Sequence, residues 1–225
     1  MTETYLQNLL AKTGLPERDL HELPSSGQTF PDGAHYRIEI SGVERASTFE
    51  AMVDEASKRG VVVHRAIGVV GGTTLLDTGE LKAMAQIAHD ARIEVVVVPN
   101  QSRGWDTGRQ IVTPEGLVSG LRLRGADNLG YAIGDILRCI EAGIRGFLVV
   151  DEGLLWVLNQ LKRTGDIPPE TVFKVSVFAG HANPAGAKVL EDLGASTFNP
   201  LSDLSLAMLA AIRKAVRIPM DVYVS

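Results

Sequence analysis

The sequence is poor in cysteine, with Cys139 as the single one among 225 residues. One thiol cannot form an internal disulfide, so a reducing, cytoplasmic location is expected. Because Cys139 lies in an apolar helical pattern, we expect it to be buried and chemically inert. The chain also contains no HExxH sequence and no paired Cys/His spacing. We therefore predict no structural zinc site and assign no other metal ligands.

Positive charge is scarce as well. Lys and Arg number 22 against 27 Asp and Glu, and the formal net charge is -5. No basic field is therefore present to attract nucleic acid or anionic lipid. No window approaches the roughly 18 consecutive apolar residues that a membrane span needs. Met1–Tyr5 has neither the basic nor the apolar segment of a signal peptide. We expect a protein that binds neither nucleic acid nor membranes.

Apolar runs typical of buried strands alternate with amphipathic helical patterns along most of the chain. The predicted strands are 35–41, 61–67, 93–98, 146–150, 172–178, 196–199 and 220–224. The predicted helices between them are 48–59, 78–91, 129–142, 154–163, 185–193 and 203–216, and a further short helix covers 4–11. This strict alternation favours an α/β fold, a TIM-barrel-like (β/α) repeat with seven strands, over an open sheet.

A complete TIM barrel has eight strands, one more than the sequence shows. Either the natural chain is longer, or the open edge is covered by a partner chain or by the N-terminal segment. An exposed apolar strand such as 220–224 tends to pair with another chain. A homo-oligomer is therefore expected.

The domain organisation follows from where the alternation holds. Residues 1–34 form a helix and an irregular lead-in, and residues 35–225 form one barrel-like domain. The segment 100–128 is too long for an ordinary connection of roughly 2–6 residues between strand and helix. We predict that it is an ordered insertion over the strand ends, a place where lids of enzymes occur.

The candidate site lies at the carboxyl ends of the predicted strands, where parallel α/β proteins build their sites. Asp151 directly follows a strand and is a candidate acid/base group or cation ligand. The competing interpretation is that Asp151 caps the next helix while Glu152 complements its dipole. His181 occupies a turn rich in Gly and Pro, where packing does not explain a histidine. It is the best candidate for a general base.

Substrate binding is assigned to side chains near the same edge. Arg103 and Arg109 can hold a carboxylate or phosphate through two parallel hydrogen bonds, although solvated loop arginines are the competing interpretation. Asn100, Asn183 and Asn199 follow or adjoin strand ends and supply hydrogen bonds.

Lys174 lies inside its predicted strand rather than at the carboxyl end, which argues against a Schiff-base lysine. Glu39 and Asp221 also lie within strands. We predict that these three residues form a buried charge network at the floor of the barrel.

Four motifs between residues 129 and 224 carry a family resemblance. They are the strand and turn Val149–Leu155, the strand and Asn turn Lys174–Asn183, the helix start Ser202–Leu206 and the strand Asp221–Val224. Together they resemble the collagenase-like peptidase family, whose catalytic mechanism is unassigned. The sequence departs from the family where Ser202 replaces an arginine and where Ser225 replaces a histidine.

The resemblance implies a barrel fold and hydrolysis, with a peptide bond as one substrate. Some members of that family act in hydroxylation of RNA or quinones and carry an iron–sulfur cluster on cysteines. A single cysteine cannot hold such a cluster, and the sequence names no cofactor.

Two hypotheses for the function follow. In the first, the chain is a barrel enzyme with acid/base chemistry on a small anionic or peptide-like substrate. In the second, it is a non-catalytic accessory or binding protein that uses an incomplete barrel and its open edge. The missing nucleophile, with no Ser-His-Asp or Cys-His pattern, permits the second hypothesis.

Overall fold

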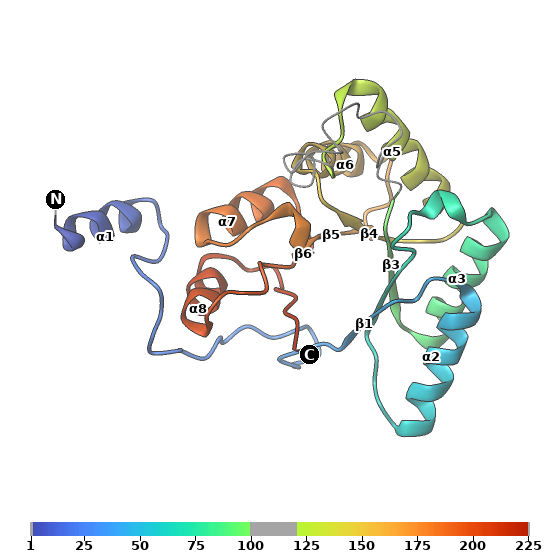
Figure 1. The fold of residues 1–225 in the computed structure, drawn as a ribbon, viewed down its shortest axis with the longest axis horizontal. Coiled ribbons are helices and arrows are strands. Elements are labelled where there is room, and N and C mark those ends of the chain that lie inside the picture. The colour runs from blue at the N-terminus through green and yellow to red at the C-terminus, as the bar shows by residue number, and fades with distance from the viewer. Residues whose placement is uncertain (1, 100–120, 225) are drawn as a thin grey trace. The chain divides into compact units, whose positions relative to one another are not determined.

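The computed structural model describes residues 2–99 and 121–224. Helices and strands alternate along these ranges (Figure 1). The strands are β1 (Glu39–Ser41), β2 (Arg65–Gly68), β3 (Glu94–Val97), β4 (Gly146–Val149), β5 (Val172–Val175) and β6 (Thr197–Phe198). The helices are α1 (Glu3–Lys12), α2 (Ala46–Arg59), α3 (Thr78–Ala91), α5 (Gly125–Glu141), α6 (Glu152–Thr164), α7 (Pro184–Leu193) and α8 (Leu206–Ala215), with short 3₁₀ turns η1 (Thr73–Leu75) and η3 (Val177–Ala179).

The strands form one sheet in the order β1-β2-β3-β4-β5-β6, so each strand neighbours the next one along the chain. The register is parallel, and Glu39, Arg65 and Glu94 begin β1, β2 and β3 in one row across the sheet. A parallel sheet with a helix after each strand is the arrangement that the alternation predicts. The prediction of a TIM-barrel-like α/β fold is confirmed, as a curled half-barrel of six strands.

The prediction of a seventh strand over 220–224 was wrong. Met220 makes only an isolated parallel bridge to Phe198, and the Asp221 amide donates to the Phe198 carbonyl at 2.8 Å. The reason is that β6 is only two residues long. A strand of that length offers a neighbouring segment one bridge and no continuing ladder.

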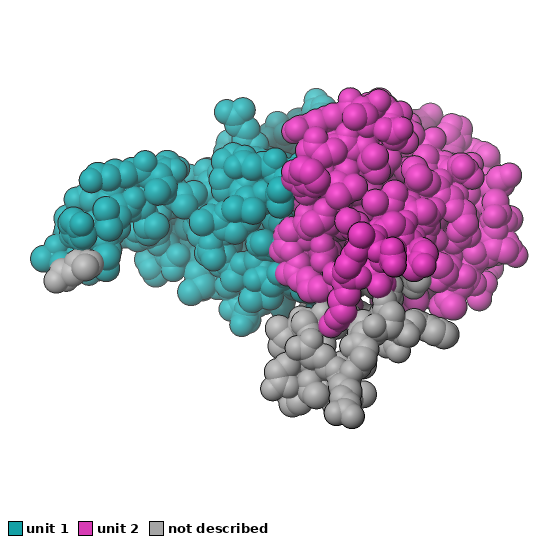
Figure 2. Space-filling model, turned by 90° about the horizontal axis from the view of Figure 1, so that it is seen from above, with its two compact units in different colours: residues 1–35, 175–225 teal, residues 36–174 magenta. Residues whose placement is uncertain are grey.

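The chain divides into two compact units, residues 36–174 and residues 1–35 with 175–225, coloured separately in Figure 2. The first unit holds β1 to β4, most of β5, and helices α2, α3, α5 and α6. The second holds α1, α7, α8 and β6. The assignment of 35–225 to a single domain stays a prediction.

The core of the unit 36–174 forms because β2, β3 and β4 consist mostly of buried residues and successive helices cover the sheet. Helix α2 contacts α3, α3 contacts α5, and α5 contacts α6 (Figure 1). The largest fully buried apolar side chains here are Phe49, Leu81, Met84, Ile136, Ile144, Phe147, Leu155, Leu158, Ile167 and Phe173. Each stabilises the fold by roughly 1.5–3 kcal/mol relative to exposure. Within the described ranges, no helix combines the length and the apolar character needed to cross a bilayer.

Cys139 is part of this core, as its helical pattern predicted. Burial, and secondarily the charge of Asp135, raise the pKa of the Cys139 thiol to about 11. The thiolate is the reactive form of cysteine. Cys139 is therefore a packing residue and not a nucleophile.

A chain of charged side chains crosses the interior of the same unit. The Lys174 side chain, only 1% exposed, extends from β5 to β1, where its Nζ lies 3.0 and 3.1 Å from the two carboxylate oxygens of Glu39. Glu39 also accepts from Arg65 at 3.2 Å, and Arg65 donates to Glu94 at 3.2 Å. Because β5 and β1 are four places apart in the sheet order, this contact requires the sheet to curl.

The network confirms the predicted pairing of Lys174 with Glu39 at the floor of the barrel, where the strands begin. Asp221 belongs to the other unit, and there its carboxylate accepts from the Thr197 hydroxyl at 2.6 Å. The charge balance of the network around Lys174 stabilises the fold, because removing one member of a buried ion pair lowers the free energy of unfolding by about 3–5 kcal/mol.

We expect Glu39→Gln to destabilise the protein by about 3 kcal/mol or more, because it removes the carboxylate that two cations share. Lys174→Met should cost clearly less, since Glu39 then keeps its pair with Arg65. Urea denaturation followed by circular dichroism measures both free energies of unfolding. An equal or larger loss for Lys174→Met would show that Glu39 is not the centre of the network.

Candidate functional site

The carboxyl ends of β1, β2 and β3 are connected to one another by their loops. Glu44, which follows β1, accepts a hydrogen bond from the Val70 amide beyond β2 at 3.0 Å. The Thr73 amide donates to the Val98 carbonyl after β3 at 3.1 Å. Gly68 must be glycine, because a Cβ there would come within 1.7 Å of the Val43 carbonyl oxygen. These contacts hold the rim of the sheet in one shape.

The loop after β2 is also anchored to helix α5. The Thr73 hydroxyl donates to the buried carboxylate of Asp135. Arg138 donates to Asp135 at 2.9 Å and to the carbonyls of Thr73 and Leu76 at 2.8 and 3.1 Å. This cluster satisfies buried polar groups with one another, which is the structural role expected of such groups. These bonds hold the segment from Gly71 to Leu76 against α5.

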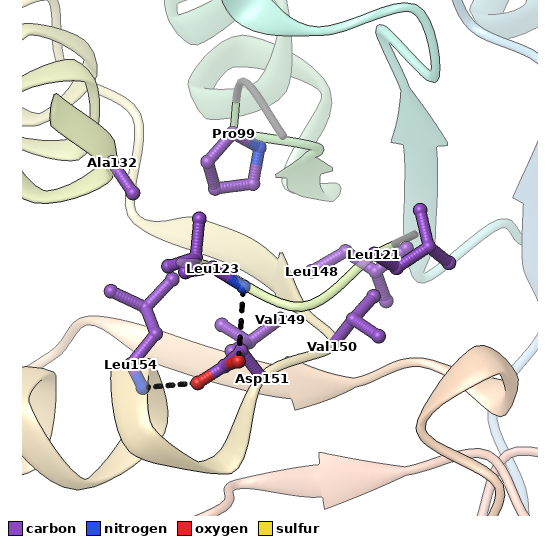
Figure 3. A pocket seen from close by; sticks show the side chains of 9 residues that line it. All are labelled: Pro99, Leu121, Leu123, Ala132, Leu148, Val149, Val150, Asp151 and Leu154. Carbon is purple, nitrogen blue, oxygen red and sulfur yellow. Dashed lines mark hydrogen bonds between the residues drawn. The ribbon is translucent and has the colours of Figure 1, made fainter. Parts of the chain in front are cut away.

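Asp151, at the end of β4, caps helix α6. Its Oδ1 accepts from the Leu154 amide at 3.0 Å, and its Oδ2 accepts from the Leu123 amide at 3.2 Å (Figure 3). A Cβ at Gly153 would lie 2.9 Å from Asp151 Oδ1, so the glycine leaves room for the cap. Both carboxylate oxygens therefore hold backbone amides. The capping interpretation of Asp151 is observed, and its acid/base role stays a prediction.

Beside Asp151, Arg122 and Glu152 form an ion pair with two parallel contacts. One guanidinium nitrogen of Arg122 donates to Glu152 Oε2 and to the Val150 carbonyl, the latter at 3.3 Å. The other nitrogen donates to Glu152 Oε1 at 3.3 Å. The side chains are 37% and 29% exposed, so solvent and solutes can reach this pair.

Sequence reasoning missed Arg122 and chose Arg103 and Arg109 from the same segment. No local spacing links Arg122 to Glu152, because 30 residues separate them in the chain. The one available signal was that Glu152 follows a strand end directly. Its partner could be found only in the folded structure.

A small cavity lies against this group, lined by Pro99, Leu121, Leu123, Ala132, Leu148, Val149, Val150, Asp151 and Leu154 (Figure 3). Its volume is about 10 Å³, roughly the room that one water needs. The walls are apolar except at Asp151. A substrate cannot enter such a space, so any ligand of this rim lies outside it, on the side of the exposed ion pair.

The unit of residues 1–35 and 175–225 contains the other predicted residues that the structure describes. Asn183 caps α7 by accepting from the Gly186 amide at 2.9 Å. His181 lies over the first turn of α7, where a Cβ at Gly186 would come within 2.9 Å of His181 Nδ1. The His181 carbonyl accepts from the Leu201 amide at 3.0 Å, which brings the turn after β5 beside the chain that follows β6.

Asn199 is buried and donates from Nδ2 to the Asp221 carbonyl at 2.9 Å. Its amide donates to the Val175 carbonyl at 2.9 Å. Asn199 and Asn183 thus have structural hydrogen bonds. The structure brings His181 and Asn183 to the same end of α7.

The predicted convergence of Asp151 with His181 and Asn199 stays a prediction, because Asp151 belongs to the other unit. Asn100, Arg103 and Arg109 lie outside the described residues. The same holds for most of the 100–128 insertion. Residues 2–99 and 121–224 contain no group of three or more His, Cys, Asp or Glu side chains that could hold a metal ion.

No family model and no curated protein matches the chain. Solved structures do match the chain. The U32 peptidase Mk0906 has a TM-score of 0.54 at 17% identity, over 88% of this chain and 72% of that one. The YdjI aldolase from Escherichia coli K12 has a TM-score of 0.55 at 14% identity, over 84% and 66%.

The putative copper homeostasis protein CutC from Streptococcus agalactiae is similar too, with a TM-score of 0.51 at 16% identity over 83% of this chain and 86% of that one. This chain has a TIM-barrel-like fold. The functions of the three similar proteins differ, and at these identities the likeness extends to the fold alone.

We expect Asp151→Asn to destabilise the protein by about 1–2 kcal/mol. An amide offers one accepting oxygen, so its NH₂ group would face either the Leu123 or the Leu154 amide. Thermal denaturation measures the loss. Asp77, the cap of α3, is the matched control because its capping bond runs to the single Glu80 amide at 2.8 Å. Asp77→Asn should change stability by less than half as much. Equal effects would show that the second bond of Asp151 contributes nothing.

Proposed function

We propose that the chain is a barrel enzyme that performs acid/base chemistry on a small anionic or peptide-like substrate at the carboxyl ends of its strands. The observation that carries this proposal is the polar group at the end of β4, where Asp151, Glu152 and Arg122 meet on a rim that hydrogen bonds hold in shape. TIM-barrel enzymes place their sites at this edge.

In this proposal His181 and Asp151 carry out proton transfer. Because both oxygens of Asp151 hold backbone amides, His181 is the stronger candidate for the general base. Arg103, Arg109 and Arg122 bind the anionic group of the substrate.

Hydrogen bonds to the substrate come from Asn100, Asn183 and Asn199. The choice of hydrolysis, and of a peptide bond, depends on the resemblance of residues 129–224 to collagenase-like peptidases and on the likeness to the U32 peptidase. The likeness to an aldolase makes carbon–carbon lysis the alternative reaction. A cytoplasmic location, inferred from the single cysteine, stays a prediction.

The test is a screen of the purified protein against short peptides and against aldol substrates, followed by His181→Ala on whichever substrate is turned over. We expect kcat to fall by about 10²- to 10⁴-fold, the contribution of a positioned acid or base. His89→Ala is the control, since His89 is an exposed histidine on α3. Its kcat should equal that of the wild type. Equal kcat for His181→Ala, with an unchanged melting temperature, would remove His181 from the mechanism.

A second candidate function is that of an accessory protein that binds a partner through its open edge. The observation that favours it is the segment after the Met220 bridge, where Val222 and Tyr223 are 49% and 61% exposed. Exposed apolar segments beside the edge of a sheet can pair with a strand of another chain. In this proposal the partner is a second copy of the chain, and the same pairing would give the expected homo-oligomer.

We expect sedimentation at micromolar concentration to show a dimer that Tyr223→Lys converts to a monomer, because a lysine on an edge disfavours pairing. The exposed Tyr36, in the other unit, provides the matched control Tyr36→Lys. That variant should stay dimeric. A monomeric wild-type protein would exclude the open edge as the means of self-association.

A further inference from the structure

We infer that Arg122 is the residue that receives the carboxylate group of the substrate, and that Glu152 is the internal carboxylate that it exchanges. The inference depends on the proposed function for the location of the site. It is tested by binding alone, so the two can fail separately.

The geometry of the pair between Arg122 and Glu152 points to a carboxylate ligand. The guanidinium group of Arg122 directs two nitrogens at the two oxygens of Glu152. A planar fork of donors fits a planar carboxylate in this way, and it can also hold a phosphate. Arg122 therefore already binds a carboxylate in this structure, namely the side chain of Glu152.

Arg122 stays in place when Glu152 leaves. The same guanidinium donates to the Val150 carbonyl at 3.3 Å. The Arg122 carbonyl accepts from Arg124 at 3.2 Å, and the next amide, Leu123, donates to Asp151 at 3.2 Å. The backbone that follows Arg122 is thus fixed to the end of β4 through the Leu123 amide. A preorganised receptor loses little entropy on binding.

The exchange of Glu152 for an external carboxylate costs little free energy. Ion pairs between exposed side chains are worth only about 0.2–1 kcal/mol. Arg122 and Glu152 are 37% and 29% exposed, whereas Lys174 in the pair with Glu39 is 1% exposed. An external carboxylate can compete for Arg122, but not for Lys174. Of these two ion pairs, only the one between Arg122 and Glu152, at the carboxyl end of β4, can exchange its carboxylate.

The ligand class is therefore a molecule with a free carboxylate. Because the neighbouring cavity of about 10 Å³ has no room for a side chain, the remainder of the ligand extends away from it along the rim. Both the carboxyl terminus of a short peptide and a small dicarboxylate fit this description. The experiment distinguishes them.

The experiment is calorimetric titration of the protein with acetyl-Ala-Ala, with its carboxyl-terminal amide, with succinate and with inorganic phosphate. We expect the two carboxylates to bind, and the amide to bind at least tenfold more weakly. Stronger binding of acetyl-Ala-Ala than of succinate assigns the peptide terminus, and the reverse assigns the dicarboxylate. Binding of the amide as tight as that of the acid, or a preference for phosphate, overturns the inference.

Two variants test the exchange. Glu152→Gln removes the internal competitor, and the carboxylate should bind about two- to fivefold more tightly, the factor that an exposed ion pair supports. Arg122→Gln should weaken binding at least tenfold. Arg122→Lys keeps the charge without the fork and should also bind more weakly than the wild type. Unchanged or weaker binding by Glu152→Gln overturns the inference.

The matched control is the ion pair of Arg145 with Glu170 at the opposite ends of the strands, joined at 2.9 Å and also exposed. Glu170→Gln and Arg145→Gln make the same changes in net charge, and both should leave carboxylate binding unchanged. If Glu170→Gln raises the affinity for the carboxylate as much as Glu152→Gln does, the change in net charge alone explains the gain. Binding that depends on Arg122 without any turnover would leave this inference standing and reject the proposed enzyme.

Discussion

The contact between Lys174 and Glu39 is the constraint on which the rest of the unit 36–174 depends. A buried ammonium group is stable only beside a negative charge, and the carboxylate that it meets starts a strand four places away in the sheet. The sheet must therefore curl far enough for the two to meet. Arg65 and Glu94 extend the network along the row where β1, β2 and β3 begin. The curl of the sheet is thus linked to the ion pairs at the floor of the half-barrel.

The two ends of the strands use charge in different ways. At the amino end of β1, Glu39 pairs with Lys174, whose side chain is enclosed by protein and stabilises the fold. At the carboxyl ends, Arg122 and Glu152 remain in contact with solvent, where an ion pair contributes little to stability. A pair that contributes little can exchange a partner without loss of the fold. This difference in exposure, more than any difference in residue type, separates the structural charges from those proposed to bind a ligand.

Much of the fold could be predicted because its causes are local. The helix predicted over 78–91 matches α3 in both of its ends, since Asp77 caps its start and the apolar residues repeat at helical spacing. The strand at 220–224 was mispredicted because an apolar run shows only that a segment can pair. Whether it does depends on its neighbour, and β6 is too short. The helix α5 begins four residues before the predicted start at 129, in a stretch without apolar periodicity.

The sequence by itself determined the TIM-barrel-like alternation, the burial of Cys139 and the presence of Asp151 at a strand end, because each follows from residues near one another in the chain. Only the tertiary structure decided what those residues contact. It directed the second oxygen of Asp151 to Leu123 and paired Arg122 with Glu152 across 30 residues. Hydrogen bonds and ion pairs act over a few ångströms of space. A linear sequence shows which groups are available for them, and the curled sheet selects which of those groups meet.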